Sequence, residues 1–397
     1  MKNKNEIQEV LENVVCTNCK SQNVIKKGKY SFRKIGEYVI RYRCKDCDQS
    51  FQGPNLKIED KLPIPFVYKN KTLDKINWNL YNQIQTNEKT TILELLNELL
   101  NLLDIPKPNK IGRPTKNIKD IIYSLLLKIY CRLSSRRLIS ELQLAKELGY
   151  IKEIPSFNTI LNYLSDNRIT LILQQLIELS SKPLINIEKN FSVDSTGFST
   201  FRYASWYDHK YNKNSIRKIF LKAHTMIGNL TNIITSITIT DQNGSDCIQF
   251  SDLVKKTAIN FKINDVCADK AYNGRDCYDV VARLGGTPYI DFKSNSTESS
   301  KGTQNYIWNK MYNLSKKNPQ EFYTHYHMRS NVECTYNMIK QKFGTELMGK
   351  TYESNANEIL CKAVCHNLCC LISAYLELNL DSNICAEALK QAEFVKS

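Results

Sequence analysis

The sequence predicts a multidomain α/β protein with a small N-terminal cysteine-bearing module, a helical region and a larger domain with a mixed β-sheet and flanking helices. Three observations predict this organisation. Two Cys-x2-Cys pairs lie near the N-terminus, apolar residues then recur at helical spacing, and β-rich segments finally alternate with helical ones. With 397 residues, of which 42% are apolar, the chain is long enough for two or three domains with buried cores.

The balance of charge indicates an anionic partner. Lys and Arg total 55 against 40 Asp and Glu, which gives a net charge of +15. Nucleic acid is the commonest partner for such an excess, although charge alone does not choose between DNA, RNA and a membrane surface. The chain has no run of 18 apolar residues, so we expect no membrane-spanning helix. Its N-terminus lacks the apolar core of a secretory signal, so we expect a cytoplasmic protein whose 14 cysteines are thiols or metal ligands.

Four cysteines are spaced as the ligands of one zinc ion. Two Cys-x2-Cys pairs stand 24 residues apart, a spacing in which each pair forms a tight turn and the two turns close a tetrahedral thiolate site. The intervening residues alternate in polarity and include two glycines, which predicts strands and turns. We therefore predict a zinc ribbon over residues 14–57, with one structural Zn²⁺ held by Cys16, Cys19, Cys44 and Cys47.

The charge of this predicted ribbon favours contact with nucleic acid. Residues 14–57 hold ten Lys and Arg against three Asp and Glu, a net charge of +7. Four thiolates and one zinc ion lower this charge to about +5, which still suits a phosphate backbone. A purely structural module that packs on its neighbour is the alternative.

A linker with one helix follows the ribbon. Residues 58–117 contain the helical segment 93–103 and a basic stretch with prolines. The Gly-Arg-Pro core of that stretch, at 112–114, fits either the minor groove of A·T-rich DNA or a solvated linker.

Residues 118–184 are predicted to be a helical, helix-turn-helix-like DNA-binding region. Apolar residues recur at helical spacing, Gly149 ends one helix, and Ser156 caps the next. A helix, a short turn and a second helix make the shape of a helix-turn-helix. An ordinary helical core is the alternative. The second helix would offer DNA the polar side chains of Asn158, Thr159, Asn162 and Arg168.

Residues 185–378 change to a mixed pattern. Three β-rich segments are followed by a helix, a strand, a helix, a strand and, after a gap, another helix. This is the element order of a ribonuclease H-like catalytic domain. The gap, at 294–325, is predicted to be a loop with a short helix, and residues 379–397 are predicted to be a C-terminal tail.

Three carboxylates in this domain suggest a site for hard cations. Asp194 and Asp269 each end a predicted strand, and Glu333 lies in a helical segment. Carboxylates without His or Cys suit Mg²⁺ or Mn²⁺, and two such ions about 4 Å apart would activate the attacking oxygen and stabilise the leaving oxygen of a phosphodiester. A strand-end Asp by itself is commonly a turn or capping residue. Nearby, we expect His224 to be structural and Asp246 to be a helix N-cap rather than a fourth ligand.

The segment around Glu333 carries a more specific pattern, Tyr326-x2-Arg329-x3-Glu333-x6-Lys340. On a helix, Arg329 and Glu333 are one turn apart, and Lys340 lies two turns further on the same face. The two cations would hold DNA phosphates beside the metal-binding carboxylate. A salt-bridged amphipathic helix is the alternative interpretation.

Together these segments resemble the catalytic segments of DDE transposases. VDSTG, ADKAYNG and the Tyr-Arg-Glu-Lys pattern stand in the order found in that family. The closest resemblance is to prokaryotic insertion-sequence transposases that bear the Tyr-Arg-Glu-Lys signature, and it covers residues 112–375. The ribbon is similar to zinc ribbons fused to transposases.

The resemblance implies a function and a role for each residue of these patterns. The triad that binds two catalytic ions would be Asp194, Asp269 and Glu333. The residues that contact double-stranded DNA near the cut would be Tyr326, Arg329 and Lys340. Such enzymes cut at the terminal inverted repeats of an element and join the freed 3′ ends to target DNA. The resemblance further implies a homodimer on DNA, associated with the prokaryotic nucleoid.

One departure from the family concerns spacing. Only 63 residues separate Asp269 from Glu333, too few for the large β insertion of some relatives, which puts a hairpin intermediate in doubt. Two other functions stay open: a ribonuclease H-like nuclease that cuts without joining, and a domesticated, non-transposing zinc-ribbon DNA-binding protein. The intact acidic triad speaks against the latter.

Overall fold

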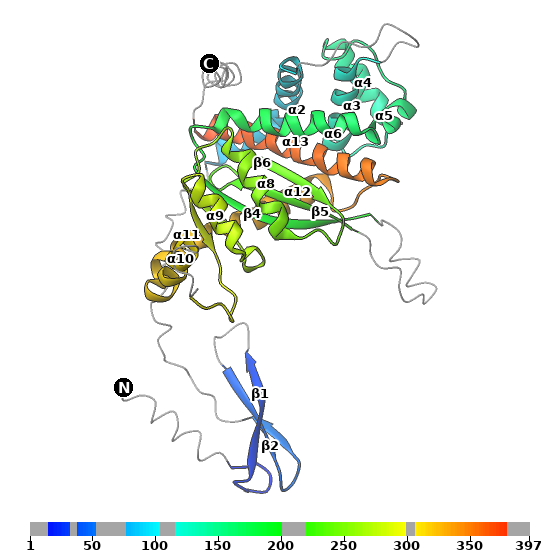
Figure 1. Cartoon of the computed structure of the whole chain (residues 1–397). Helices are drawn as coiled ribbons and strands as arrows, with labels where there is room; N and C mark the ends of the chain where they lie inside the picture. Colours follow the sequence, from blue (N-terminus) through cyan, green and yellow to red (C-terminus); the bar gives the residue numbers. More distant parts are fainter. Residues whose placement is uncertain are drawn as a thin grey trace. The chain divides into compact units, whose positions relative to one another are not determined.

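The computed structural model divides into two compact units, Met1–Lys75 and Ile76–Ser397, which are described here one at a time (Figure 1). The structure describes residues 15–31, 38–52, 77–103, 116–200, 220–298 and 306–378. The Gly-Arg-Pro stretch at 112–114 and the predicted tail at 379–397 lie outside the described residues.

The first unit contains a three-stranded antiparallel sheet in the order β1-β2-β3. The strands are β1 (Val24–Ser31), β2 (Tyr38–Cys44) and β3 (Ser50–Gln52). The ring of Tyr42 on β2 stacks on that of Phe51 on β3, with centroids 6.0 Å apart, and Tyr42 is buried. This aromatic pair and the cysteine cluster form the interior of a very small module, which agrees with the predicted ribbon.

The second unit is built on a mixed five-stranded sheet with the order β6-β5-β4-β7-β8. The strands are β4 (Asn190–Ser199), β5 (Phe220–Gly228), β6 (Ile234–Thr240), β7 (Asp265–Ala268) and β8 (Thr287–Ile290). The first three pair antiparallel, whereas β7 and β8 run parallel to β4. The predicted order of three strands, helix, strand, helix and strand is confirmed, and the fold is ribonuclease H-like.

Helices cover both faces of this sheet, which is why its central strands are apolar throughout. One face packs on α8 (Asp246–Ala258) and α9 (Arg275–Arg283). Phe191 and Val193 of β4 and Met226 of β5 lie in that core with Phe250 of α8, and all four side chains are fully buried.

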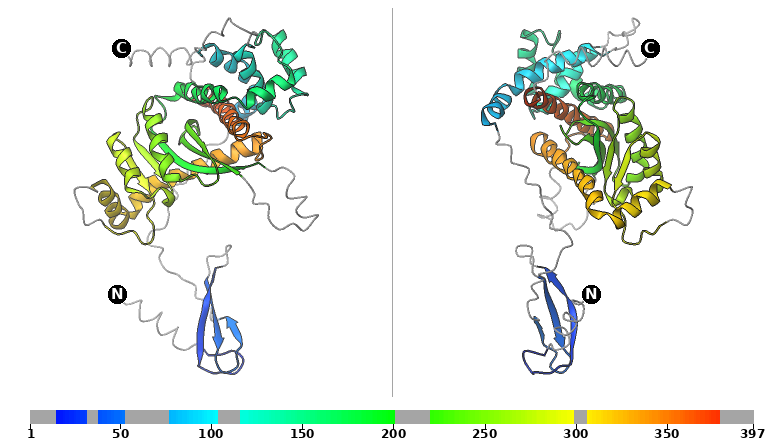
Figure 2. Two further views of the ribbon diagram at one scale, coloured as in Figure 1. Left: turned by 45° about the vertical axis from the view of Figure 1, so that its right-hand side comes forward. Right: turned by 90° about the vertical axis from the view of Figure 1, so that its left-hand side faces the viewer.

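The other face shares one continuous core with the remaining helices. These are α2 (Trp78–Asn101), α3 (Ile118–Tyr130), α4 (Leu138–Glu147), α5 (Phe157–Leu164), α6 (Asn167–Ser181), α12 (Ser330–Phe343) and α13 (Tyr352–Glu377). Figure 2 shows α13 between the N-terminal helices of this unit and the sheet. The predicted domain boundary between residues 184 and 185 stays a prediction, because helices on one side of it and strands on the other are packed into the same core.

Helix α13 is the central support of this unit. Buried Asn367 accepts a hydrogen bond of 2.9 Å from the main chain of Ile234 on β6 and donates one of 2.9 Å to Ser180 of α6, so one amide joins three elements. Among the described helices, α13 is also the one long and apolar enough to cross a membrane by length and composition. Of its apolar window, 78% is buried inside the fold, as in the core helix of a globular domain.

The segment between β8 and α12 contains more helix than the sequence predicted. It forms α10 (Tyr306–Lys317) and α11 (Pro319–Tyr326), where we expected a loop with one short helix. Asn318 separates the two helices, because its side chain caps α11 while Pro319 takes the first helical position. Trp308 of α10 is buried edge-on against Tyr278 and Phe292, so it is a core aromatic. Three short 3₁₀ turns complete the unit: η1 (Lys182–Leu184), η2 (Lys270–Tyr272) and η3 (His327–Arg329).

Candidate functional site

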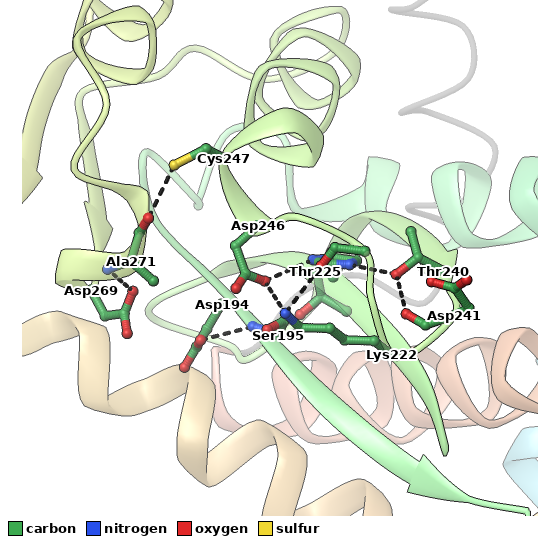
Figure 3. A network of polar contacts seen from close by, with 12 residues as sticks. Asp194, Ser195, Lys222, Thr225, Thr240, Asp241, Asp246, Cys247, Asp269 and Ala271 are labelled. Atoms are coloured by element: carbon green, nitrogen blue, oxygen red, sulfur yellow. Dashed lines mark hydrogen bonds and ion pairs between the residues drawn. The ribbon is translucent and has the colours of Figure 1, made fainter. Parts of the chain in front are cut away.

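Two carboxylates stand side by side on adjacent strands. β4 and β7 run parallel, and Val193 pairs with Ala268 at the end of their shared register. Asp194 and Asp269 are the next residues, on strands about 4.8 Å apart (Figure 3). Asp269 follows β7 directly and caps η2 by accepting a hydrogen bond of 2.8 Å from the N–H of Ala271. The prediction that Asp194 ends its strand is wrong, because β4 continues beside β5 after leaving β7.

The third carboxylate comes from α12. Glu333 lies in the first turn of that helix, and Arg329 lies in the 3₁₀ turn just before it. The guanidinium of Arg329 is 3.3 Å from Oδ2 of Asp194 and 2.6 Å from Oε1 of Glu333. Asp194 and Arg329 are mostly buried, whereas 60% of the Glu333 side chain is exposed. The site is therefore open to solvent on the side of α12.

The electrostatics of this cluster suit a hard divalent cation. The pKa of Asp194 is raised to about 6, chiefly because its carboxyl is buried. A hydrogen bond from the N–H of Ser195 lowers that pKa, the negative charges of Asp269 and Glu333 raise it, and Arg329 lowers it. Three carboxylates thus influence one another beside one guanidinium. Their oxygen-only donor set and their excess of negative charge fit Mg²⁺ or Mn²⁺.

A tyrosine that we did not single out from the sequence joins two parts of the site. The hydroxyl of Tyr336 donates a hydrogen bond of 2.6 Å to the main-chain oxygen of Asp194 and lies 2.7 Å from Oγ1 of Thr225 on β5. Tyr336 is one helical turn beyond Glu333, so the helix that carries Glu333 also fixes the strand that carries Asp194. Burial raises the pKa of Tyr336 well above its ordinary value, so its hydroxyl stays protonated.

The remaining residues of the Tyr-Arg-Glu-Lys pattern lie on either side of the carboxylates. Tyr326 is the last residue of α11, and its half-buried ring stacks on that of Phe322 with centroids 6.2 Å apart. Lys340 of α12 donates a hydrogen bond of 2.6 Å to Oγ1 of Thr196, two residues beyond Asp194 on β4. Partial burial lowers the pKa of Lys340. The structure thus brings Lys340, Arg329 and Glu333 to the edge of one strand, β4.

A second polar network lies behind Asp194 on β5 and α8 (Figure 3). Oδ1 of Asp246 is 2.7 Å from Nζ of Lys222 and 3.2 Å from Nδ1 of His224. His224 is fully buried and also contacts Oγ1 of Thr240 at 2.9 Å, which makes it a structural histidine as expected. Burial lowers its pKa. The prediction that Asp246 is an N-cap is wrong, because Ser245 takes that position and Asp246 begins α8.

The four N-terminal cysteines form a separate candidate metal centre. Sγ of Cys16 lies 3.6 Å from that of Cys47, Sγ of Cys19 lies 3.5 Å from that of Cys44, and all four sulfurs lie within 4.8 Å of one another. Four thiolates around a tetrahedral zinc ion, with Zn–S bonds of about 2.3 Å, are about 3.8 Å apart. The cluster therefore has the ligand type, number and spacing that a zinc ion requires.

The fold and the carboxylate cluster define a class of protein, the ribonuclease H-like polynucleotidyl-transfer domains. Residues 188–368 match the family model of the transposase DDE domain. This range runs from the start of β4 into α13 and includes the three carboxylates. This part of the chain therefore belongs to the transposase DDE domain family. None of the curated proteins matches the chain.

Proposed function

We propose that the protein is a DNA transposase that cuts at the terminal inverted repeats of an insertion sequence and joins the freed 3′ ends to target DNA. The observation that supports this most is the convergence of Asp194, Asp269 and Glu333 within a domain of the DDE family. Carboxylates from three distant segments are costly to gather, because their mutual repulsion opposes folding.

These three carboxylates would hold two Mg²⁺ or Mn²⁺ ions. When bound, the ions would activate the attacking oxygen and stabilise the leaving oxygen of a phosphodiester. Arg329 joins Asp194 to Glu333, and Tyr336 holds the main chain of Asp194, so the chain itself keeps the carboxylates in one place.

The cations of the site would bind and orient the DNA. The guanidinium of Arg329 matches a phosphate as a two-pronged donor, and Lys340 offers a point charge on the same helix face. Tyr326 presents a half-buried ring at the end of α11, where it would contact the backbone near the cut.

The proposed reaction has two balanced steps. In the first, water adds to the scissile phosphorus, the bond from phosphorus to the 3′ oxygen breaks, and that oxygen leaves as a 3′-hydroxyl. In the second, this hydroxyl loses its proton and bonds to a phosphorus of the target, whose own 3′ oxygen leaves and takes up a proton. No net phosphodiester bond is lost in the second step, so it needs no external energy source.

The other parts of the chain would serve DNA recognition and assembly. One Zn²⁺ at the four cysteines would hold the ribbon, whose basic charge suits double-stranded DNA. We expect the helices between 118 and 184 to contact DNA as well, and two copies to bind the two ends together. The protein would work in the prokaryotic cytoplasm, associated with the nucleoid.

A cleavage and strand-transfer assay tests this proposal. The substrate is duplex DNA that carries the sequences flanking the open reading frame, with Mg²⁺ or Mn²⁺ and with Glu333→Gln as the control. We expect metal-dependent cutting and joining that are absent with Glu333→Gln. Cutting without joining would identify a nuclease instead, and binding without cutting by either protein would identify a non-transposing DNA-binding protein.

A further inference from the structure

A basic groove lies beside the carboxylate site within the second unit. It has a volume of about 770 Å³ and lies between the turn from α3 to α4, the helix α5, and the C-terminal end of α12 with the loop that follows it. Five cationic side chains line it: Lys128, Arg132, Arg136, Arg137 and Lys340. Two carboxylates, Glu346 and Glu358, also line it and are outnumbered.

The three arginines are available to a ligand. Arg132, Arg136 and Arg137 are exposed, and none of them forms an ion pair with a carboxylate among the residues that the structure describes. Surface arginines near acidic residues normally find such partners, so a row of three without one marks an anion-binding surface. Glu358, by contrast, is buried and already accepts a hydrogen bond of 2.8 Å from the N–H of Met348.

Arg132 stands where glycine would be more favourable. Its φ is +54°, and its N–H bonds to the carbonyl oxygen of Ile129 while the N–H of Leu133 bonds to that of Lys128. These two bonds form a Schellman motif, in which the left-handed residue is usually glycine. An arginine with strained backbone at this position indicates that its side chain has a function there. That side chain reaches Gly344 across the groove, where a Cβ would lie 3.2 Å from Nη2.

The groove also contains groups that suit a nucleotide strand. The guanidinium of Arg136 lies over the ring of Phe157, 4.7 Å from its centroid, which holds a flat cation and an aromatic face in one wall. The hydroxyl of Ser135 is buried in the lining and has no hydrogen-bond partner among the described residues. A phosphate or sugar oxygen would satisfy that hydroxyl. Lys340 belongs to this wall and to the site around Asp194, so the two are continuous.

We infer that this groove binds the sugar–phosphate backbone of the DNA that adjoins the scissile phosphate. The inference rests on the proposed function, and it adds a second contact surface made by the helical region and the catalytic helix α12 together. A strand that passes Lys340 would run along Arg132 to the pair Arg136 and Arg137. The helical region would then position the cleavage site through the backbone, independently of any base-reading helix.

The experiment compares three full-length proteins on one duplex that carries an element end and its flank. The first is the wild type, the second carries Arg132→Gly, Arg136→Ala and Arg137→Ala, and the third is a matched control. The control removes three exposed cations from the opposite face of the sheet, with Lys255→Ala, Lys256→Ala and Arg283→Ala. Binding is measured as a function of salt without added divalent metal, and phosphate ethylation interference maps the contacted phosphates.

We expect the groove variant to bind about 100-fold more weakly near 0.1 M salt, with a salt slope lower by about two to three, because each phosphate contact contributes about 0.9 to that slope. The lost contacts should fall within about one helical turn of the cut. Glycine relieves the strain at residue 132, so the melting temperature should not fall with Arg132→Gly alone. The control should bind as the wild type does.

Three results would overturn the inference: an unchanged slope in the groove variant, an equal loss in the control, or lost phosphates far from the cut. The proposed function fails separately. If the wild type does not cut DNA while the slope still changes, the groove remains a DNA-binding surface and the transposase proposal is refuted. If the wild type cuts and joins while the slope is unchanged, the groove inference alone is refuted.

Discussion

The two candidate metal centres of this protein are built in opposite ways. The four cysteines come from two short turns within 32 residues of sequence, in a unit that has almost no other core. The three carboxylates come from positions 194, 269 and 333, and a sheet with helices on both faces brings them together. The first centre is therefore encoded by local chain geometry, and the second by the whole fold.

The cysteine turns show this local encoding directly. In one turn the N–H of Cys16 bonds to the carbonyl oxygen of Ser21, and in the other the N–H of Cys44 bonds to that of Gln49, five residues on in both cases. Lys20 and Asp48 hold the same left-handed conformation, with φ of +60° and +59°. The same turn is thus used twice, and each use orients two sulfurs without help from distant residues.

The largest expected effect comes from removing the metal of the cysteine site. Structural zinc contributes about 10 kcal/mol or more to the folding of such modules. We therefore expect one zinc per chain by elemental analysis, and zinc chelation to make residues 15–52 sensitive to proteases. The unit from residue 76 onward should keep its melting temperature. Cys19→Ser should lose the zinc and Cys131→Ser, at a half-exposed thiol of the second unit, should keep it. A zinc-free ribbon that still resists proteolysis would contradict this view.

The carboxylate centre should respond in the reverse manner. Asp269→Asn should lower the rate of cleavage by about 10³-fold, or about 4 kcal/mol of transition-state stabilisation, because one ligand of the catalytic ions is weakened. The melting temperature should not fall, since one of several repelling carboxylates is neutralised. Rates come from single-turnover cleavage and stability from calorimetry. Unfolding that accompanies the loss of activity would show that Asp269 is structural.

Tyr336 offers a smaller and sharper test of how the fold positions the carboxylates. Tyr336→Phe removes a hydroxyl that joins Asp194 to Thr225, which should cost about 1–3 kcal/mol of stability and lower the cleavage rate by about tenfold. Tyr278→Phe is the matched control, because its buried hydroxyl donates a bond of 2.8 Å to Ile290 away from the carboxylates. The control should lose similar stability and keep its rate. Equal rates for the two variants would remove Tyr336 from the positioning role.

The smallest expected effect concerns pH and the core helix α13. Burial lowers the pKa of His366 to about 4 in the folded protein, against about 6.5 when unfolded. The unfolded chain therefore binds this proton first, so stability is lost as pH falls from 6.5 to 4, by at most about 1.4 kcal/mol per pH unit. His366→Gln should flatten the stability profile of the second unit in that window. Identical pH profiles for the two proteins would show that His366 does not titrate as expected.

The sequence predicted most of the fold because its signals are local. Cysteine spacing indicated the ribbon, and the alternation of strands and helices gave the order of the sheet. Asp269 was recognisable because a short apolar strand ends immediately before it. The pattern from Tyr326 to Lys340 was recognisable because helical spacing is regular.

What the sequence did not predict depends on distant partners. The hydrogen-bond partners of Tyr336 are 142 and 111 residues away, so no local pattern marks it. The basic groove combines Arg132 with Lys340, and only the packing of α3, α5 and α12 brings such residues together. Two helices instead of one between β8 and α12 followed from a cap at Asn318 that we did not recognise.

The most direct test of the carboxylate centre is iron-mediated cleavage of the protein chain. Fe²⁺ bound in place of Mg²⁺ generates radicals that cut the main chain beside the metal, and mass spectrometry locates the cuts. If three segments share one site, cuts will appear together near residues 194, 269 and 333, and excess Mg²⁺ or Asp194→Asn will abolish all of them. Cuts near one carboxylate alone, or a pattern unchanged by Asp194→Asn, would contradict a shared centre.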